Sequence, residues 1–157
     1  MRTVSKPHVL LVDDDEDVRH MTRVSLGFEG FEVTAVGDGQ AGLDAARADR
    51  PDAMILDVMM PGIDGLDVLR QIRADPALHG LPVLLLTAKA GVSAEHEGWT
   101  AGATAYLTKP FTGTALAATL RGLLESGAAD ARATALARLD LVNQFDRAAD
   151  NLSDQKR

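Results

Sequence analysis

The chain of 157 residues contains no cysteine, which excludes a disulfide framework, a thiolate metal site and a cysteine nucleophile. It also lacks a long apolar run, because no stretch approaches the roughly 20 apolar residues of a membrane-spanning helix. The first seven residues carry two cations but no apolar segment of signal-peptide length behind them. We therefore expect a globular protein of the cytoplasm with no membrane as a partner.

Positive charge is scarce and is not clustered. The chain has 16 Lys and Arg against 23 Asp and Glu, a formal net charge of -7. Residues 1–127 carry 11 cations and 18 anions, whereas residues 128–157 carry five of each. A surface that binds nucleic acid needs clustered Lys and Arg to displace counterions from the phosphate backbone. We therefore expect no nucleic acid as a direct partner of this chain.

Five short apolar runs alternate with five segments of helical periodicity. This alternation is typical of an α/β protein in which crossover helices cover a parallel sheet. Residues Asp38 and Asp64 stand where helix caps are needed. The predicted strands span residues 8–13, 31–36, 53–57, 81–87 and 105–107. The predicted helices span residues 16–28, 40–48, 66–74, 93–101 and 112–125.

The length is that of one domain with an appended element. We assign residues 1–127 to the domain and residues 128–157 to a C-terminal helical extension or linker. Thirty residues cannot form a second core, so this extra helix would dock on the domain, form a homodimer contact or lead into a further domain. Its apolar positions are spaced by three and four residues, as in an amphipathic helix: Leu136, Leu139, Val142, Phe145, Ala149 and Leu152.

Charged and hydroxyl side chains stand where the predicted strands end. Asp13 and Asp14 end the first strand, Asp57 the third and Thr87 the fourth, while Lys109 follows the fifth strand by two residues. In an open parallel sheet, functional groups collect just beyond the carboxyl ends of the strands. If the first and third strands are neighbours, about 4.8 Å apart, their terminal carboxylates converge on one small volume.

Three carboxylates in one small volume need a cation. Oxygen ligands without cysteine or histidine suit a hard ion such as Mg²⁺ and disfavour zinc. A carboxylate held against Mg²⁺ can attack a phosphoryl group if other groups neutralise the charge on the transferring oxygens. Lys109 would supply an ammonium group for this purpose and Thr87 a hydroxyl group. The sequence therefore predicts phosphoryl transfer to an aspartate.

Each of these residues has a plainer explanation when it is taken alone. The acidic run 13–17 could be a solvated helix start, and Asp57 could cap a turn. Coincidence is a poor explanation for five residues of the required types at four strand ends. The histidines are expected to serve only in packing or at the surface, because they lie on separate elements: His8, His20, His79 and His96.

Four segments resemble the receiver domain of two-component response regulators in their order and spacing. They are LVDDDE at 11–16, ILDVMMPGIDG at 55–65, LLLTAKA at 84–90 and GATAYLTKPF at 102–111. The resemblance covers residues 8 to about 126. It implies a doubly wound five-stranded parallel sheet of flavodoxin-like order 2-1-3-4-5, for which the chemotaxis regulator of this family is a standard example.

The resemblance also implies roles for individual residues. Asp57 would be the phosphorylation site, and Asp13 and Asp14 would hold Mg²⁺ together with Asp57 and the backbone carbonyl of Met59. Thr87 and Lys109 would contact the phosphoryl oxygens as catalytic groups.

Two further residues of the resemblance concern the response to phosphorylation. Tyr106 matches the aromatic residue that acts with Thr87 as a switch, and the Lys109 to Pro110 peptide would be cis. The phosphodonor would be a histidine kinase or a histidine phosphotransfer protein. The signal would pass to a downstream protein target or an output domain.

Such a receiver would catalyse only its own phosphorylation and dephosphorylation, so we expect no enzyme in the usual sense. Two other functions stay open at this point. The chain could be the N-terminal regulatory receiver of a larger protein whose output domain lies beyond Arg157. It could also be an aspartate-dependent phosphatase of small molecules, although the chain lacks residues for a substrate pocket or a cap domain.

Overall fold

The computed structural model describes residues 5–88 and 92–125 of the chain. The amphipathic helix predicted within residues 128–157 lies outside these described residues, and so does its expected role in association. Among the described residues, no helix is both long enough and apolar enough to cross a membrane.

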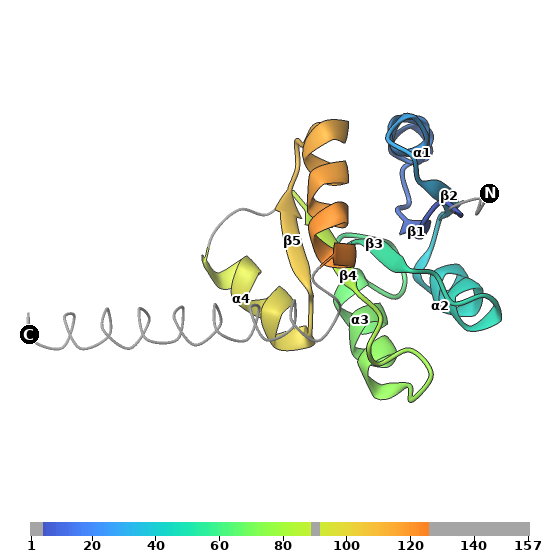
Figure 1. Cartoon of the computed structure of the whole chain (residues 1–157). Helices are drawn as coiled ribbons and strands as arrows, with labels where there is room; N and C mark the ends of the chain where they lie inside the picture. Colours follow the sequence, from blue (N-terminus) through green and yellow to red (C-terminus); the bar gives the residue numbers. More distant parts are fainter. Residues whose placement is uncertain (1–4, 89–91, 126–157) are drawn as a thin grey trace, which may run out of the picture.

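Five parallel strands form a single sheet, as predicted from the alternating pattern (Figure 1). The spatial order is β2-β1-β3-β4-β5, which confirms the order implied by the resemblance. The strands are β1 (His8–Val12), β2 (Glu32–Val36), β3 (Ala53–Asp57), β4 (Val83–Thr87) and β5 (Ala105–Thr108).

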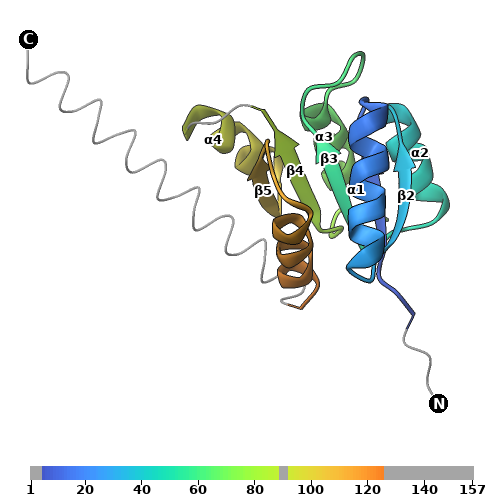
Figure 2. The same cartoon turned by 90° about the horizontal axis from the view of Figure 1, so that it is seen from above.

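Helices follow the strands in alternation. They are α1 (Glu16–Phe28), α2 (Gly39–Ala48), α3 (Gly65–Ala74) and α4 (Val92–Ala101), and residues 113–125 are also helical. In Figure 2, α1 and the helix over residues 113–125 lie on one side of the sheet, and α2, α3 and α4 lie on the other. This is the doubly wound arrangement expected from the sequence.

Both faces of the sheet are buried at its three central strands, β1, β3 and β4, which explains why these strands are almost continuously apolar. Alternate residues of each strand point to opposite faces. One cluster packs the sheet against α2, α3 and α4, and includes Leu10, Met54, Leu56, Leu69, Leu85 and Trp99. The other packs it against α1 and the helix over residues 113–125, and includes Leu11, Leu26, Ile55, Leu84, Leu116 and Leu120.

Several predicted boundaries were wrong by one or two residues. The first strand ends at Val12 and not at residue 13, the second begins at Glu32 and not at residue 31, and the fifth ends at Thr108 and not at residue 107. The fourth begins at Val83 and not at residue 81. Here the carbonyl of Leu81 accepts a hydrogen bond from Arg73, and Pro82 has no N–H to donate to a sheet.

The helix starts were also shifted by one residue. Helices α2, α3 and α4 begin one residue earlier than predicted, whereas the last helix begins at residue 113 and not at 112. The hydroxyl of Thr112 accepts a hydrogen bond from the amide of Ala115, as an N-cap does. The two predicted caps are confirmed, since Asp38 caps α2 and Asp64 caps α3 with their side chains.

Candidate functional site

The sheet register brings the predicted site residues to one edge. Val12 of β1 lies beside Leu56 of β3, so Asp13, directly after β1, lies next to Asp57, the last residue of β3. Asp57 pairs with Leu86 of β4, and Thr87 pairs with Thr108 of β5. The backbone amide of Lys109 then donates to the carbonyl of Thr87 at 2.7 Å. Residues far apart in the sequence therefore meet at the carboxyl ends of the strands.

Asp13 is fully buried, and all of its polar groups have partners. Its amide donates to the carbonyl of Val36 at 3.2 Å, and its carbonyl accepts from Arg19 Nη1 at 2.8 Å. The carboxylate accepts from the amide of Asp15 at 3.0 Å and from Lys109 Nζ at 3.2 Å. A buried carboxylate held by so many donors keeps one fixed orientation.

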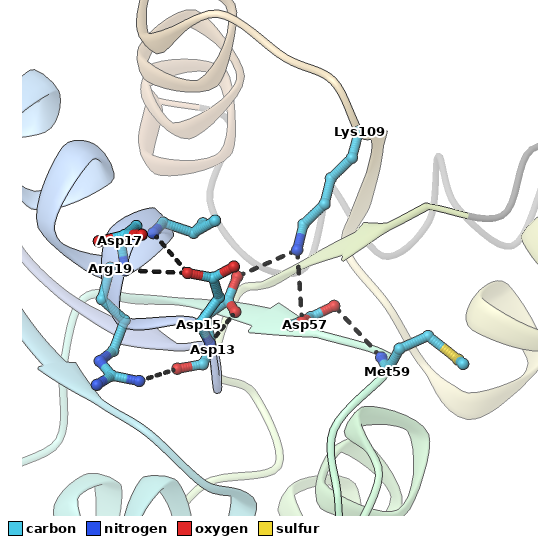
Figure 3. A network of polar contacts seen from close by, with 8 residues as sticks. Asp13, Asp15, Asp17, Arg19, Asp57, Met59 and Lys109 are labelled. Carbon is cyan, nitrogen blue, oxygen red and sulfur yellow. Dashed lines mark hydrogen bonds and ion pairs between the residues drawn. The ribbon is translucent and has the colours of Figure 1, made fainter.

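Asp57, the last residue of β3, is only 4% exposed. One carboxylate oxygen lies 3.4 Å from Lys109 Nζ, and the other accepts from the amide of Met59 at 3.3 Å (Figure 3). The backbone at Gly65 packs directly against the backbone of Asp57. A Cβ atom at Gly65 would lie 2.1 Å from the carbonyl oxygen of Asp57, so only glycine fits at the start of α3.

Asp14 completes a cluster of three carboxylates. Asp13, Asp14 and Asp57 each offer one oxygen, and these three oxygens lie within 4.8 Å of one another. Unlike the other two, Asp14 is exposed, and within the described part of the chain its carboxylate has no hydrogen-bond partner. Three carboxylate oxygens without sulfur or imidazole fit a hard divalent cation such as Mg²⁺.

The family model of the response regulator receiver domain matches residues 9–121. The chain belongs to this family. Among curated proteins, the transcriptional regulatory protein CseB of Streptomyces coelicolor is 46% identical over 117 residues, which are 74% of this chain and 49% of CseB. The response regulator MprA of Mycolicibacterium vanbaalenii is 45% identical over 138 residues, which are 85% of this chain and 59% of MprA. This receiver chain therefore spans about half the length of such relatives.

Solved structures agree with this assignment. The chemotaxis protein CheY4 of Vibrio cholerae is 34% identical with a TM-score of 0.72, covering 76% of this chain and 99% of CheY4. A putative response regulator from Chloroflexus aurantiacus is 38% identical with a TM-score of 0.73, covering 76% of this chain and 98% of that protein. The receiver fold of this chain is therefore shown by both sequence and structure.

In this receiver site, the pKa values of Asp57 and Lys109 are each subject to opposing effects of burial and neighbouring charges. Burial raises the pKa of Asp57 to about 6, helped by the nearby charge of Asp13, although Lys109 and the amide of Met59 act to lower it. Burial by itself would lower the pKa of Lys109, but Asp57 and Asp13 outweigh it and the pKa is raised. Lys109 therefore stays an ammonium ion at neutral pH. Its single charge does not balance three carboxylates, so the site favours a further cation.

Asp57→Asn should make the metal-free protein more stable at neutral pH. The pKa of Asp57 in the folded protein lies above the unfolded value of 3.8. The free energy of unfolding therefore falls as pH rises from about 4 to 6, and the full loss is reached above pH 6. We expect the variant to gain about 2 kcal/mol in free energy of unfolding at pH 7.5. Urea unfolding in EDTA measures it, and the gain should shrink below about 1 kcal/mol at pH 4. An equal gain at both pH values would contradict the role of ionisation.

Thr87 and Tyr106, the residues expected to form the switch, lie on the neighbouring strands β4 and β5. Thr87 is 1% exposed at the end of β4, and the half-buried ring of Tyr106 on β5 lies 6.5 Å from the ring of Trp99. Thr87, Tyr106 and Met59 line one cavity of about 550 Å³ between the β3–α3 loop and α4. The Lys109–Pro110 peptide is cis in the structure.

Sequence reasoning missed two residues that hold Asp13 in place. They are Asp15, which caps α1 and donates its amide to the carboxylate of Asp13, and Arg19, which donates to the carbonyl of Asp13. One local signal was available, because Arg19 lies four residues after the helix cap and hence one turn into α1. That signal places the side chain near the strand end but does not name the atom that it contacts.

Proposed function

We propose that Asp57 accepts a phosphoryl group from a histidine kinase or a histidine phosphotransfer protein, and that the new charge switches a protein-binding surface. The observation that supports this most directly is the local environment of the Asp57 carboxylate. A buried carboxylate lies 3.4 Å from an ammonium group and within 4.8 Å of two further carboxylates that can share a metal ion.

In the proposed reaction, a carboxylate oxygen of Asp57 attacks the phosphorus atom and forms an acyl phosphate. The bond from phosphorus to the imidazole nitrogen of the donor breaks, and its electron pair stays on that nitrogen. Lys109 compensates negative charge on the transferring oxygens, and the hydroxyl of Thr87 lies at the neighbouring strand end to bind one of them.

The residues that would hold Mg²⁺ are Asp13, Asp14 and Asp57, with the backbone carbonyl of Met59 as a fourth ligand. When bound, the ion would offset the charge of the carboxylates and of the phosphoryl oxygens. Asp13 is already held rigidly by its four polar contacts, so this part of the site needs little rearrangement to bind a cation.

Phosphorylation would be sensed through Thr87 and Tyr106. Both line the same cavity next to the loop that follows Asp57, so a shift of the Thr87 hydroxyl toward a phosphoryl oxygen would change the space open to the Tyr106 ring. The result would be a changed face formed by α4, β5 and the helix over residues 113–125. The chain would thus be a cytoplasmic switch and not an enzyme acting on other molecules.

A second arrangement is favoured by the lengths of the relatives. This chain covers 49% of CseB, which is a transcriptional regulatory protein, so an output domain beyond Arg157 would fit the same receiver. Contact with DNA would then belong to that domain, because the cations of residues 1–127 are outnumbered and dispersed.

The proposed function is tested with a small phosphodonor. Acetyl phosphate and Mg²⁺ should add one phosphoryl group to the whole chain, seen as an increase of about 80 Da in intact mass. EDTA should suppress the increase, because the acidic cluster then repels the incoming anion. Labelling that is as fast in EDTA as in Mg²⁺ would count against a metal-assisted receiver.

A further inference from the structure

Arg19 contacts the acidic cluster through the main chain and not through a carboxylate. From α1 its Nη1 donates to the carbonyl oxygen of Asp13 at 2.8 Å, while Lys109 reaches the carboxylate of the same residue (Figure 3). The carbonyl of Asp13 belongs to the peptide group that joins Asp13 to Asp14. A hydrogen bond to this oxygen therefore fixes the plane of that peptide.

Asp14 depends on that peptide plane for its orientation. Within the described residues, its exposed carboxylate has no hydrogen-bond partner, in contrast to the carboxylates of Asp13 and Asp57. Only its backbone aims it at the other two oxygens of the cluster. A rotation of the peptide group before Asp14 would thus move one of the three oxygen ligands.

Gly37, in the loop after β2, provides the space in which Arg19 lies. A Cβ atom at this position would come within 2.9 Å of Nη1 and 3.4 Å of Cζ of Arg19. These are atoms at the far end of a flexible side chain, so an alanine here would displace the guanidinium group and leave the fold intact. The φ angle of Gly37 is not in the left-handed region that favours glycine.

We propose that Arg19 is a positioning residue for divalent cation binding: through the carbonyl of Asp13 it orients the carboxylate of Asp14, and Gly37 keeps the space for it. This inference rests on the proposed function, since the cation is the Mg²⁺ that serves phosphorylation. Groups that orient metal ligands typically alter metal affinity by about 10- to 100-fold when they are removed.

Two variants test the proposal in the full chain, with Mg²⁺ titrated by calorimetry. Arg19→Met removes the donor and retains the length of the side chain, and Gly37→Ala displaces the guanidinium group while its charge stays. We expect the dissociation constant for Mg²⁺ to rise about 10-fold in both. The phosphorylation rate at saturating Mg²⁺ should stay near that of the wild type, whereas the half-saturating Mg²⁺ concentration should rise.

Matched controls separate this effect from general changes. Arg23→Met removes an exposed arginine from the same helix, and Gly27→Ala adds a methyl group where no other atom lies within 4 Å. Neither should change Mg²⁺ affinity. Arg19→Lys retains the charge but offers a different donor geometry, so it should restore affinity only in part.

The outcomes decide between three explanations. If Arg19→Met binds Mg²⁺ more tightly than the wild type while Gly37→Ala binds like the wild type, Arg19 acts only through its positive charge, which repels the cation, and the positioning role is wrong. If both variants bind like the wild type, Arg19 has no role at the site, although the proposed function stands. If the wild type itself does not bind Mg²⁺, the proposed function fails and this inference fails with it.

Discussion

Asp57→Asn is expected to abolish the phosphoryl adduct that acetyl phosphate and Mg²⁺ produce. The amide is not a nucleophile at neutral pH. Among the carboxylates of the described residues, only Asp13 and Asp57 are both buried and paired with Lys109, and the side chain of Asp13 is fully buried, so a phosphodonor cannot reach it. The intact mass of the variant should therefore lack the increase of about 80 Da seen in the wild type.

Asp64→Asn is the matched control for this experiment. Asp64 follows Asp57 on the same loop and caps α3, and asparagine caps helices about as well as aspartate does. This variant should be phosphorylated like the wild type. An adduct of the same size in Asp57→Asn would show that another residue accepts the phosphoryl group.

Asp14→Ala is expected to weaken Mg²⁺ binding by more than about 100-fold, because it removes an oxygen ligand outright and not only a group that orients one. Asp17→Ala removes the same charge from the first turn of α1, where Asp17 is exposed and only its amide contacts Asp15. The second variant should bind Mg²⁺ nearly as the wild type does. Calorimetry with the two proteins at equal ionic strength makes the comparison.

Comparison of Asp14→Ala with Asp17→Ala separates direct ligation of Mg²⁺ from long-range electrostatic attraction of the cation. Both variants raise the net charge of the chain by one unit, so a purely electrostatic attraction of the cation would be weakened to a similar extent in each. Equal losses of affinity in the two variants would mean that Asp14 is not a ligand. A loss confined to Asp14→Ala would support the three-carboxylate cluster.

The fold could be predicted from the sequence to a large extent. Continuously apolar runs in alternation with helical periodicity predicted a parallel sheet covered on both faces, and the capping aspartates Asp38 and Asp64 were placed correctly. The errors were at element ends, such as Val83 and residue 113. There the boundary depends on which partner a backbone group finds, and for Leu81 that partner is Arg73 from another element.

The candidate site, like the fold, could be predicted only in part. Which residue types stand at the strand ends could be predicted from the sequence, because motif spacing and strand ends are local properties of the chain. Three other features became visible only in the folded protein. Lys109 pairs with both Asp13 and Asp57, and Asp57 is 4% exposed with its pKa raised to about 6. Arg19 donates to the carbonyl of Asp13 beside Gly37. Burial and hydrogen-bond partners depend on segments that lie far apart along the chain, and these meet only when the strands are ordered and the helices are packed on them.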